Sequence, residues 1–332
     1  MEDLNINVVD MHTGGEPLRI IVSGYPTVIG DTILEKRAYV KANLDHLRKF
    51  LMFEPRGHFD MFGALPVEPD VAEADAAFLF MHNEGYPTMC GHAVIALGRY
   101  CVDQGIVEYK EPETEVKIQC PCGLVKAFVT CKDGCTDTVR FQSVPAFVVE
   151  TNLMIQLQAN HEIKVDISYG GAFYVFVNID DLDLHYSNID GLKNACREIK
   201  AAVTKQVTIS HPDNISLNFI YGVIFTKQCP NEDKILELCI FADQQLDRSP
   251  CGSGVTAMMA LLHHKGLVSL EKQKTFENPL THSKFLSKVI NTTKCGDKAA
   301  VVVEVAGNGY YTGKSTFTSE KKDRLNSGFL LV

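Results

Sequence analysis

The sequence predicts a mixed α/β protein made of two similar domains, each with strands wrapped around one central helix. The first observation is a repeat: residues 80–107 and 241–268 align without a gap, and each places a Cys-Gly pair ten residues after a Phe. The second is an earlier repeat in the same order, in which an Asp-x-x-x-Gly-Gly pattern begins at Asp10 and again at Asp166. Motifs repeated in order predict a duplicated fold, with its seam near residues 139–150.

The third observation is the distribution of β-branched and aromatic residues, which favour strands. They gather in short segments between turn residues. We expect strands at residues 6–12, 19–29, 76–82, 116–120, 124–131, 138–144, 174–179, 219–225, 236–242 and 299–307.

Three further segments fit helices. Residues 33–51 carry apolar side chains at helical spacing with charges between them, which predicts an amphipathic surface helix. Residues 91–104 and 252–265 are apolar almost all round, which predicts helices buried on every side. Each of these two is followed by a glycine suited to a left-handed cap, Gly105 or Gly266. Each buried helix therefore has a cysteine, Cys90 or Cys251, at its N-terminus.

Composition narrows the class of protein. A chain of 332 residues fits two domains better than one, and 45% hydrophobic with 22% charged residues is typical of a soluble globular protein. The net charge is −9 and no Lys/Arg cluster occurs, so we expect no nucleic-acid partner. Apolar runs are too short for a membrane span, and the N-terminus has no signal-peptide core. We expect a cytoplasmic protein.

Eleven cysteines, an odd number without a secretory signal, predict reduced thiols rather than a disulfide framework. The closely spaced pairs Cys120/Cys122 and Cys131/Cys135 do not have the spacing of a zinc site, so we expect no metal. Most of these thiols fit small core residues. An inert buried thiol is the alternative for Cys90 and Cys251 as well.

A thiol at a helix N-terminus has a chemistry of its own. The first turn offers free N–H groups and a partial positive charge, which favour thiolate over thiol and can bind a carboxylate. Gly91 and Gly252 follow the two cysteines, so no Cβ blocks an anion. If both helices point into one cleft, one thiolate can remove an α-proton and the other thiol can return a proton to the opposite face. That inverts a stereocentre without metal or pyridoxal cofactor.

Other residues of the motifs fit such a site. His92 could position the substrate, or be structural. Asp247 could hold a substrate nitrogen; its alternatives are to cap its own turn or to pair with Arg248. The segment EPRGHFDMFGA, residues 54–64, could supply a pocket wall through His58 and Phe62, or be an ordinary loop.

The motifs MHTGGEP, EPRGHFDMFGA, MCGHA and DRSPCGSG resemble, in combination and over nearly the whole chain, the proline racemase family of the diaminopimelate epimerase-like fold. The resemblance implies two pseudo-symmetric α/β (α+β) domains, each a β-barrel-like sheet around a central helix. We expect the first at residues 1–137, to which about 318–332 return, and the second at 138–317. It also implies a homodimer that acts on an imino acid without a cofactor.

Carried over residue by residue, the resemblance implies that Cys90 and Cys251 are the two acid/base thiols. It implies that Gly91, His92, Gly252 and Ser253 bind the substrate carboxylate, and that Asp247 with His92 lies at the substrate nitrogen.

The family holds three activities: proline racemase, 4-hydroxyproline 2-epimerase and trans-3-hydroxy-L-proline dehydratase. Stretches such as VVDMHTGGEPLRI and YGGAFY look most like the animal dehydratase, which carries Thr where this chain has Cys251. In trans-3-hydroxyproline the α-hydrogen and the hydroxyl lie on one ring face, so elimination needs a base there and no donor opposite. Because Cys251 can return a proton, we expect a proline or hydroxyproline racemase. The alternative is the dehydratase, with Cys90 as base.

Two interpretations from other classes stay open. Facing thiols could form a disulfide in a redox sensor, although neither lies in a CxxC motif. An imino-acid-binding protein without catalysis would not need both thiols, and it would bind a ligand without exchanging the α-hydrogen.

Overall fold

The computed structural model describes residues 4–158, 161–213, 215–229 and 232–331. The chain divides into two compact units, Met1–Phe141 with Asn308–Val332, and Gln142–Gly307. The domain bounds expected from the sequence, 1–137 with 318–332 and 138–317, stay a prediction. Within the part of the chain that the structure describes, no helix is long and apolar enough to cross a membrane.

The first unit is a sheet whose strand order is β17-β1-β2-β3-β4-β5-β6. Neighbours pair antiparallel except β2 with β3 and β4 with β5, which are parallel. The strands are β1 (Asn5–Thr13), β2 (Glu16–Ser23), β3 (Gly63–Val67), β4 (Ala76–Met81), β5 (Glu113–Cys120), β6 (Gly123–Lys132), β7 (Cys135–Gln142) and β17 (Gly309–Thr318).

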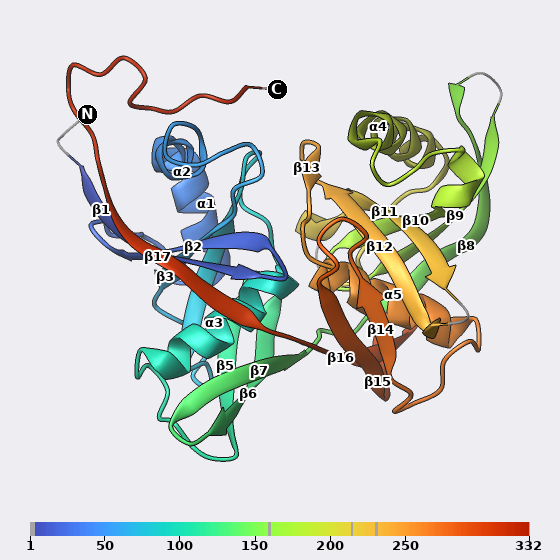
Figure 1. Ribbon diagram of the computed structural model, residues 1–332, viewed down its shortest axis with the longest axis horizontal. Coiled ribbons are helices and arrows are strands. Elements are labelled where there is room, and N and C mark those ends of the chain that lie inside the picture. Colours follow the sequence, from blue (N-terminus) through green and yellow to red (C-terminus); the bar gives the residue numbers. More distant parts are fainter. Residues whose placement is uncertain (1–3, 159–160, 214, 230–231, 332) are drawn as a thin grey trace. The chain divides into compact units, whose positions relative to one another are not determined.

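The central helix of this unit is α3 (Gly91–Asp103), which contacts β1, β2, β5, β6 and β17 (Figure 1). Almost every residue on it is buried, as its apolar composition predicts. The helix is followed by Gly105 at φ +69°, the left-handed conformation expected of it. Strands around a fully buried helix are the arrangement that the sequence predicts.

The single helix expected over residues 33–51 is two helices, α1 (Ile33–Asn43) and α2 (Asp45–Met52). Leu44 between them has φ −122° and ψ 13°, which is not helical. Asp45 opens α2 and its carboxylate accepts from the Arg48 guanidinium at 2.6 Å. The prediction of one helix was wrong because the apolar spacing continues across the break and periodicity alone cannot detect it.

The second unit repeats the pattern of strand directions. Its order is β8-β9-β10-β11-β12-β14-β15-β16, antiparallel except for β10 with β11 and β12 with β14. The short β13 (Gln245–Leu246) pairs with β12. The other strands are β8 (Phe147–Gln156), β9 (Glu162–Tyr169), β10 (Phe173–Asn178), β11 (Ile220–Cys229), β12 (Lys234–Phe241), β14 (Lys274–Glu277), β15 (Lys284–Cys295) and β16 (Lys298–Gly307).

The second central helix is α5 (Gly252–His264), which contacts β8, β9, β10, β15 and β16 (Figure 1). Gly266 follows it at φ +70°. A helix that the sequence interpretation missed, α4 (Ile189–Gln206), packs on β8, β11 and β12. Its buried side chains recur at helical spacing, which is the signal that could have found it: Leu192, Cys196, Ile199 and Val203.

The ten expected strand segments all contain strand, but their ends and number differ from the structure. The segment expected at 19–29 ends as β2 at Ser23, because Gly24 at φ +83° turns the chain and Pro26 cannot donate to a ladder. The interpretation missed strands such as β8 and β15, in which buried and exposed residues alternate. Such strands have one face in solvent, so polar and charged residues interrupt their apolar ones.

Candidate active site

The first candidate site lies at the N-terminus of α3, where Cys90 is the N-cap residue. Its backbone is extended, with φ −152° and ψ 108°, and its sulfur accepts from the Ala93 N–H at 3.4 Å. The sulfur also lies 3.1 Å from Nδ1 of His92. Only 5% of Cys90 is exposed. The thiol is therefore held between a helix amide and an imidazole in a nearly dry environment.

The ring of His92 is neutral. Burial lowers the pKa of His92 to about 3, against a smaller opposing effect of a hydrogen bond to the Pro17 backbone. Proline has no N–H, so the ring donates and the Pro17 carbonyl accepts. A neutral imidazole has one N–H, which leaves the other nitrogen as an acceptor for the Cys90 thiol. Thr13 fixes the backbone here, because its hydroxyl donates to the His92 carbonyl at 2.9 Å.

Of the two candidate wall residues, Phe62 lies at this site and His58 is exposed. The Phe62 ring meets His92 edge to face, with centroids 4.9 Å apart and an interplanar angle of 76°. It is fully buried at the end of the loop that precedes β3. His58 is an exposed residue of the same loop. The backbone N–H of Met61 donates to the carbonyl of His58 at 3.0 Å.

The second candidate site lies at the N-terminus of α5, where Cys251 is the N-cap residue. Its backbone is left-handed, with φ 48° and ψ 87°, and its side chain makes no cap hydrogen bond. The thiol donates to the Tyr174 hydroxyl at 3.7 Å, and that hydroxyl lies 2.7 Å from Ser253 Oγ. Burial raises the pKa of Tyr174 well above its usual value, so the phenol is neutral.

A glycine makes room for the Cys251 sulfur. A Cβ on Gly254 would lie 3.1 Å from that sulfur and 2.4 Å from Cδ1 of Ile224. Contacts this short require the neighbours to move. In the Gly-Ser-Gly sequence after Cys251, Gly254 therefore has no side chain that would collide with the Cys251 sulfur.

Asp247 connects to Cys251 through Ser249. Oδ1 of Asp247 accepts from both the Ser249 N–H and the Ser249 hydroxyl at 2.8 Å, and Ser249 Oγ accepts from the Cys251 N–H at 3.2 Å. Asn278 holds this loop, because its side-chain amide donates to the carbonyls of Asp247 at 3.0 Å and Ser249 at 3.1 Å. Asp247 thus caps its own turn, which is one of the alternatives expected from the sequence. Hydrogen bonds from Asn278 to the carbonyls of Asp247 and Ser249 hold the loop.

The second site is rich in buried acids. Burial raises the pKa of Asp247 to about 6, although the Ser249 hydrogen bonds oppose this. Glu237 and Cys239, on β12, are also fully buried, and burial raises the pKa of each well above its usual value, with Cys251 and Asp247 adding to the effect. Burial thus favours the neutral forms of Glu237 and Cys239, whereas Asp247, with a pKa of about 6, is ionised at neutral pH and can pair with a cation.

The structure thus groups Gly91, His92 and Phe62 with Cys90. It separately groups Asp247, Gly252 and Ser253 with Cys251. That both thiols share one cleft stays a prediction. The sequence interpretation missed four residues that hold these groups: Thr13, Tyr174, Ser249 and Asn278. Ser249 was within reach, since it stands between Asp247 and Cys251, but the others come from distant strands and loops.

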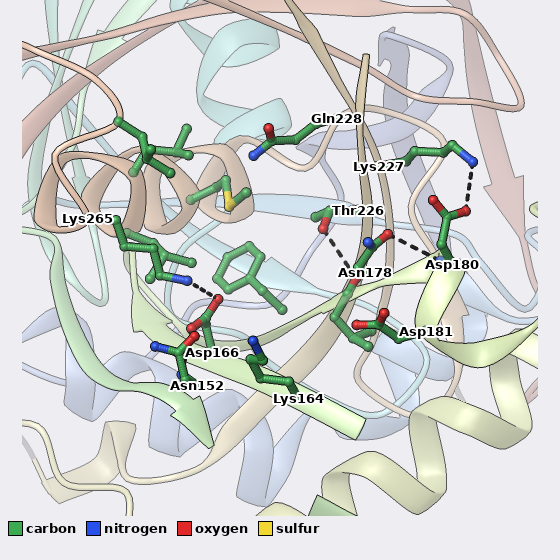
Figure 2. A pocket seen from close by; sticks show the side chains of 16 residues that line it. Asn152, Lys164, Asp166, Asn178, Asp180, Asp181, Thr226, Lys227, Gln228 and Lys265 are labelled. Atoms are coloured by element: carbon green, nitrogen blue, oxygen red, sulfur yellow. Dashed lines mark hydrogen bonds and ion pairs between the residues drawn. The ribbon is translucent and has the colours of Figure 1, made fainter. Parts of the chain in front are cut away.

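A pocket of roughly 410 Å³ opens elsewhere on the second unit, beside the C-terminal half of α5. Figure 2 shows its charged lining, in which Lys265 pairs with Asp166 at 2.6 Å and Lys227 with Asp180 at 2.7 Å. None of the predicted site residues lines it. Two of its lysines are thus paired with carboxylates of the protein, and neither thiol lines it, so it does not compete with the thiols as the candidate active site.

Comparison with known proteins identifies the family. The proline racemase family matches residues 8–330. This chain belongs to the proline racemase family. Trans-L-3-hydroxyproline dehydratase of Saccoglossus kowalevskii is 54% identical over 325 residues, covering 97% of this chain and 100% of the relative. Trans-3-hydroxy-L-proline dehydratase of Homo sapiens is 49% identical over 334 residues, covering 98% and 94%.

Solved structures show the fold. A hydroxyproline epimerase from Agrobacterium vitis with bound trans-4-hydroxy-L-proline superposes with a TM-score of 0.92 at 29% identity, covering 98% of this chain and 95% of that one. A PhzF-family phenazine biosynthesis protein of Bacillus anthracis shares the fold, with a TM-score of 0.60 at 12% identity, covering 96% and 99%. The epimerase-like fold expected from the sequence is confirmed.

The protein is therefore an enzyme of the proline racemase family. The relatives carry dehydratase names, whereas the first expectation from the sequence was a racemase or epimerase. The names of these relatives favour the alternative expected from the sequence, a trans-3-hydroxy-L-proline dehydratase.

Proposed function

We propose that this protein is a trans-3-hydroxy-L-proline dehydratase in which Cys90 is the base. The observation that carries the proposal is end-to-end similarity at about half of all positions to relatives of that name, 54% and 49% identical. The epimerase of known structure is more distant, at 29%. The site around Cys90 supports the proposal because one thiol with a neutral imidazole beside it is sufficient for elimination.

The reaction balances with proton transfers alone. The Cys90 thiolate takes the α-proton, and the electrons of that C–H bond form a double bond between Cα and C3. The hydroxyl leaves C3 from the same ring face and takes the proton that Cys90 holds, which releases water and restores the thiolate. The enamine then moves its N–H proton to C3 and becomes Δ1-pyrroline-2-carboxylate.

The helix terminus supplies the electrostatics of this reaction. Free amides at the start of α3, next to Gly91, would bind the substrate carboxylate and stabilise the charge that develops on it as the α-proton leaves. The neutral His92 would orient the Cys90 thiol by accepting a hydrogen bond from it, while the amides of the first turn favour the thiolate. The His92 N–H toward Pro17 keeps the acceptor nitrogen turned to the sulfur.

The second group of residues would bind the rest of the substrate. In this proposal Asp247 holds the substrate nitrogen, and Gly252 and Ser253 contribute to carboxylate binding. The raised pKa of Asp247, about 6, still leaves it ionised at neutral pH. Phe62 and His58 remain candidates for the pocket wall. A cytoplasmic homodimer that needs no cofactor is part of the same proposal, and light scattering on a sizing column tests the dimer.

A second candidate function, a proline or hydroxyproline 2-epimerase, is favoured by one observation. The resemblance assigns Thr to animal dehydratases at position 251, and this chain has a thiol there that donates to the Tyr174 hydroxyl. A thiol can return a proton to the α-carbon where a threonine hydroxyl cannot readily do so. Epimerisation is therefore the alternative outcome after Cys90 removes the α-proton.

The test is incubation of the purified protein with trans-3-hydroxy-L-proline, trans-4-hydroxy-L-proline and L-proline, each alone in deuterated water and followed by proton NMR. The proposal expects only the 3-hydroxy compound to lose its signals to a dehydrated ring product. Deuterium at the α-carbon of proline or 4-hydroxyproline with an inverted product, and no dehydration of the 3-hydroxy compound, would replace the proposal by the epimerase.

A further inference from the structure

Three potential metal ligands meet in the second unit, outside both thiol sites. Cys295 Sγ lies 3.8 Å from His211 Nε2 and 3.6 Å from Asp213 Oδ2. The three ligand atoms all lie within 4.8 Å of one another. Cys295 is buried, His211 is half-buried and Asp213 is exposed. Neither the proposed dehydration nor the family resemblance gives these residues a role.

The backbone brings this cluster together from two separate segments. Cys295 is the last residue of β15 and pairs with Lys298, the first residue of β16, across a tight hairpin. Gly296 in that hairpin has φ +55°, and a Cβ there would lie 2.6 Å from Cβ of Pro212. The hairpin therefore sits directly against the segment that carries His211 and Asp213, which places the sulfur beside both.

The imidazole is held in place before any ligand binds. The His211 ring meets Tyr169 edge to face, with centroids 4.7 Å apart, and lies 5.8 Å from the Phe147 ring. The backbone N–H of His211 donates to Oδ1 of Asn218 at 2.7 Å. An aromatic setting and a fixed backbone restrict the ring, so that little conformational entropy is lost when it becomes a ligand.

The two separations measured from the sulfur are close to those of a tetrahedral metal site. Zinc binds sulfur at about 2.3 Å and nitrogen or oxygen at about 2.0–2.2 Å. With tetrahedral angles, a sulfur ligand then lies about 3.5 Å from a nitrogen or oxygen ligand of the same ion. The distances here are 3.8 and 3.6 Å. A thiolate, an imidazole and a carboxylate are also a donor set that suits zinc.

We propose that His211, Asp213 and Cys295 form a binding site for a divalent metal of the zinc class, with water as the fourth ligand. Binding releases the Cys295 proton. It also requires the His211 proton to be on Nδ1, which now accepts from the Asp213 N–H at 3.1 Å. Metal binding therefore breaks the hydrogen bond from the Asp213 N–H to Nδ1 of His211 and forms a bond between the metal and Nε2.

The site would act as a clip. The ion ties β15 to the segment before β11 across 84 positions of the chain from His211 to Cys295. A ligand that binds the folded protein and not the unfolded chain stabilises the folded state. We therefore expect the metal to raise the melting temperature of the folded protein.

Cobalt(II) is the probe, because a thiolate bound to it gives a charge-transfer absorption in the near ultraviolet. The full-length protein is stripped with a chelator, desalted and titrated with Co²⁺, and the band is then displaced with Zn²⁺. We expect one equivalent to give the band in the wild type and in Cys135→Ser, whose exposed thiol is the matched control. We expect no band in Cys295→Ser.

Asp213→Asn keeps the proposal testable if the buried Cys295→Ser change prevents folding, since Asp213 is exposed. We expect its Co²⁺ affinity to fall at least about tenfold, a loss of the size seen when groups supporting a metal site are removed. A band that persists unchanged in Cys295→Ser, disappears instead in Cys90→Ser or Cys251→Ser, or is absent from the wild type would overturn the proposal. Absorbance and melting temperature do not depend on the dehydration reaction, so either proposal can fail alone.

Discussion

Cys90 and Cys251 occupy the same position in two similar helices, yet their surroundings differ. Cys90 has an extended backbone, and its sulfur caps α3 through the Ala93 N–H. Cys251 has a left-handed backbone and caps nothing. The third residue after the cysteine is Ala93 in one case and Gly254 in the other, because the Cys251 sulfur lies over that position.

The difference teaches which thiol is arranged as a base. A left-handed conformation costs a non-glycine residue about 1–3 kcal/mol, so the fold holds Cys251 in a strained position. Its polar partners are the neutral Tyr174 phenol and the Asp247 carboxyl, with which it shares a side-chain hydrogen bond. The partner of Cys90 is a neutral imidazole with an acceptor nitrogen. The Cys90 sulfur accepts a helix amide, which favours its thiolate, so the proposed dehydration relies on Cys90. Cys251 is the position where family members can differ in outcome.

The largest expected effect follows from replacing the first thiol. Cys90→Ser should lower kcat for dehydration by about 10²–10⁴-fold, the usual contribution of a general base, because a hydroxyl does not ionise at neutral pH. Steady-state assays of trans-3-hydroxy-L-proline consumption measure it. Cys101→Ser, a buried cysteine farther along α3, controls for loss of a buried thiol. Equal losses in both variants would mean that packing rather than chemistry explains the effect.

The next change separates the two outcomes of the carbanion. Cys251→Thr restores the residue that the resemblance assigns to dehydratases, and we expect dehydration to stay within a few-fold of wild type. Any inversion of the α-carbon of proline should disappear, because the donor on the opposite face is gone. Proton NMR of both substrates measures the two rates. If dehydration instead falls as far as in Cys90→Ser, the assignment of one base is wrong.

A smaller effect concerns Asp247, which has no acidic counterpart four residues before Cys90, where Tyr86 stands. Burial raises the pKa of Asp247 from 3.8 to about 6, so its protonated form favours folding. This contribution is present below about pH 4 and is lost as the pH rises through about 6, amounting to about 3 kcal/mol.

Urea unfolding between pH 4 and pH 7 tests this dependence. We expect Asp247→Asn to remove it, because an amide stays neutral and its oxygen can still accept from Ser249. Asp181→Asn, at an exposed acid of the same unit, should keep the wild-type dependence. A stability profile that is identical in wild type and Asp247→Asn would contradict the raised pKa.

The smallest expected effect is at Gly254. Gly254→Ala gives the second helix the residue that the first has at Ala93, and its Cβ must displace either Ile224 Cδ1 or the Cys251 sulfur. We expect a loss of stability of about 1–3 kcal/mol, as for overpacking, and little change in dehydration by Cys90. Ala93→Gly is the reciprocal variant. A large loss of activity in Gly254→Ala without loss of stability would show that Cys251 matters more than proposed.

Much of the fold could be predicted from the sequence because its strongest signals are local. The apolar composition of α3 and α5 predicts their burial, and both helices begin at the glycine of the repeated Cys-Gly pair. The sequence interpretation missed the break at Leu44 because apolar spacing continues through it. It missed the helix α4 because polar and charged residues separate its four buried positions.

The sequence by itself determined which residues stand next to each thiol, since Gly91, His92, Gly252 and Ser253 are its chain neighbours and follow it into the first turn. Tertiary structure alone decided the partners that come from other strands and loops. Tyr174 reaches Ser253 across 79 positions and Asn278 reaches Asp247 across 31. Cys295 likewise shows no metal-site spacing in the sequence, because its neighbours His211 and Asp213 arrive only when the β15–β16 hairpin packs against them. Neighbours in the chain stay close in any fold, whereas contacts between residues far apart in the sequence depend on how the sheet packs around its helix.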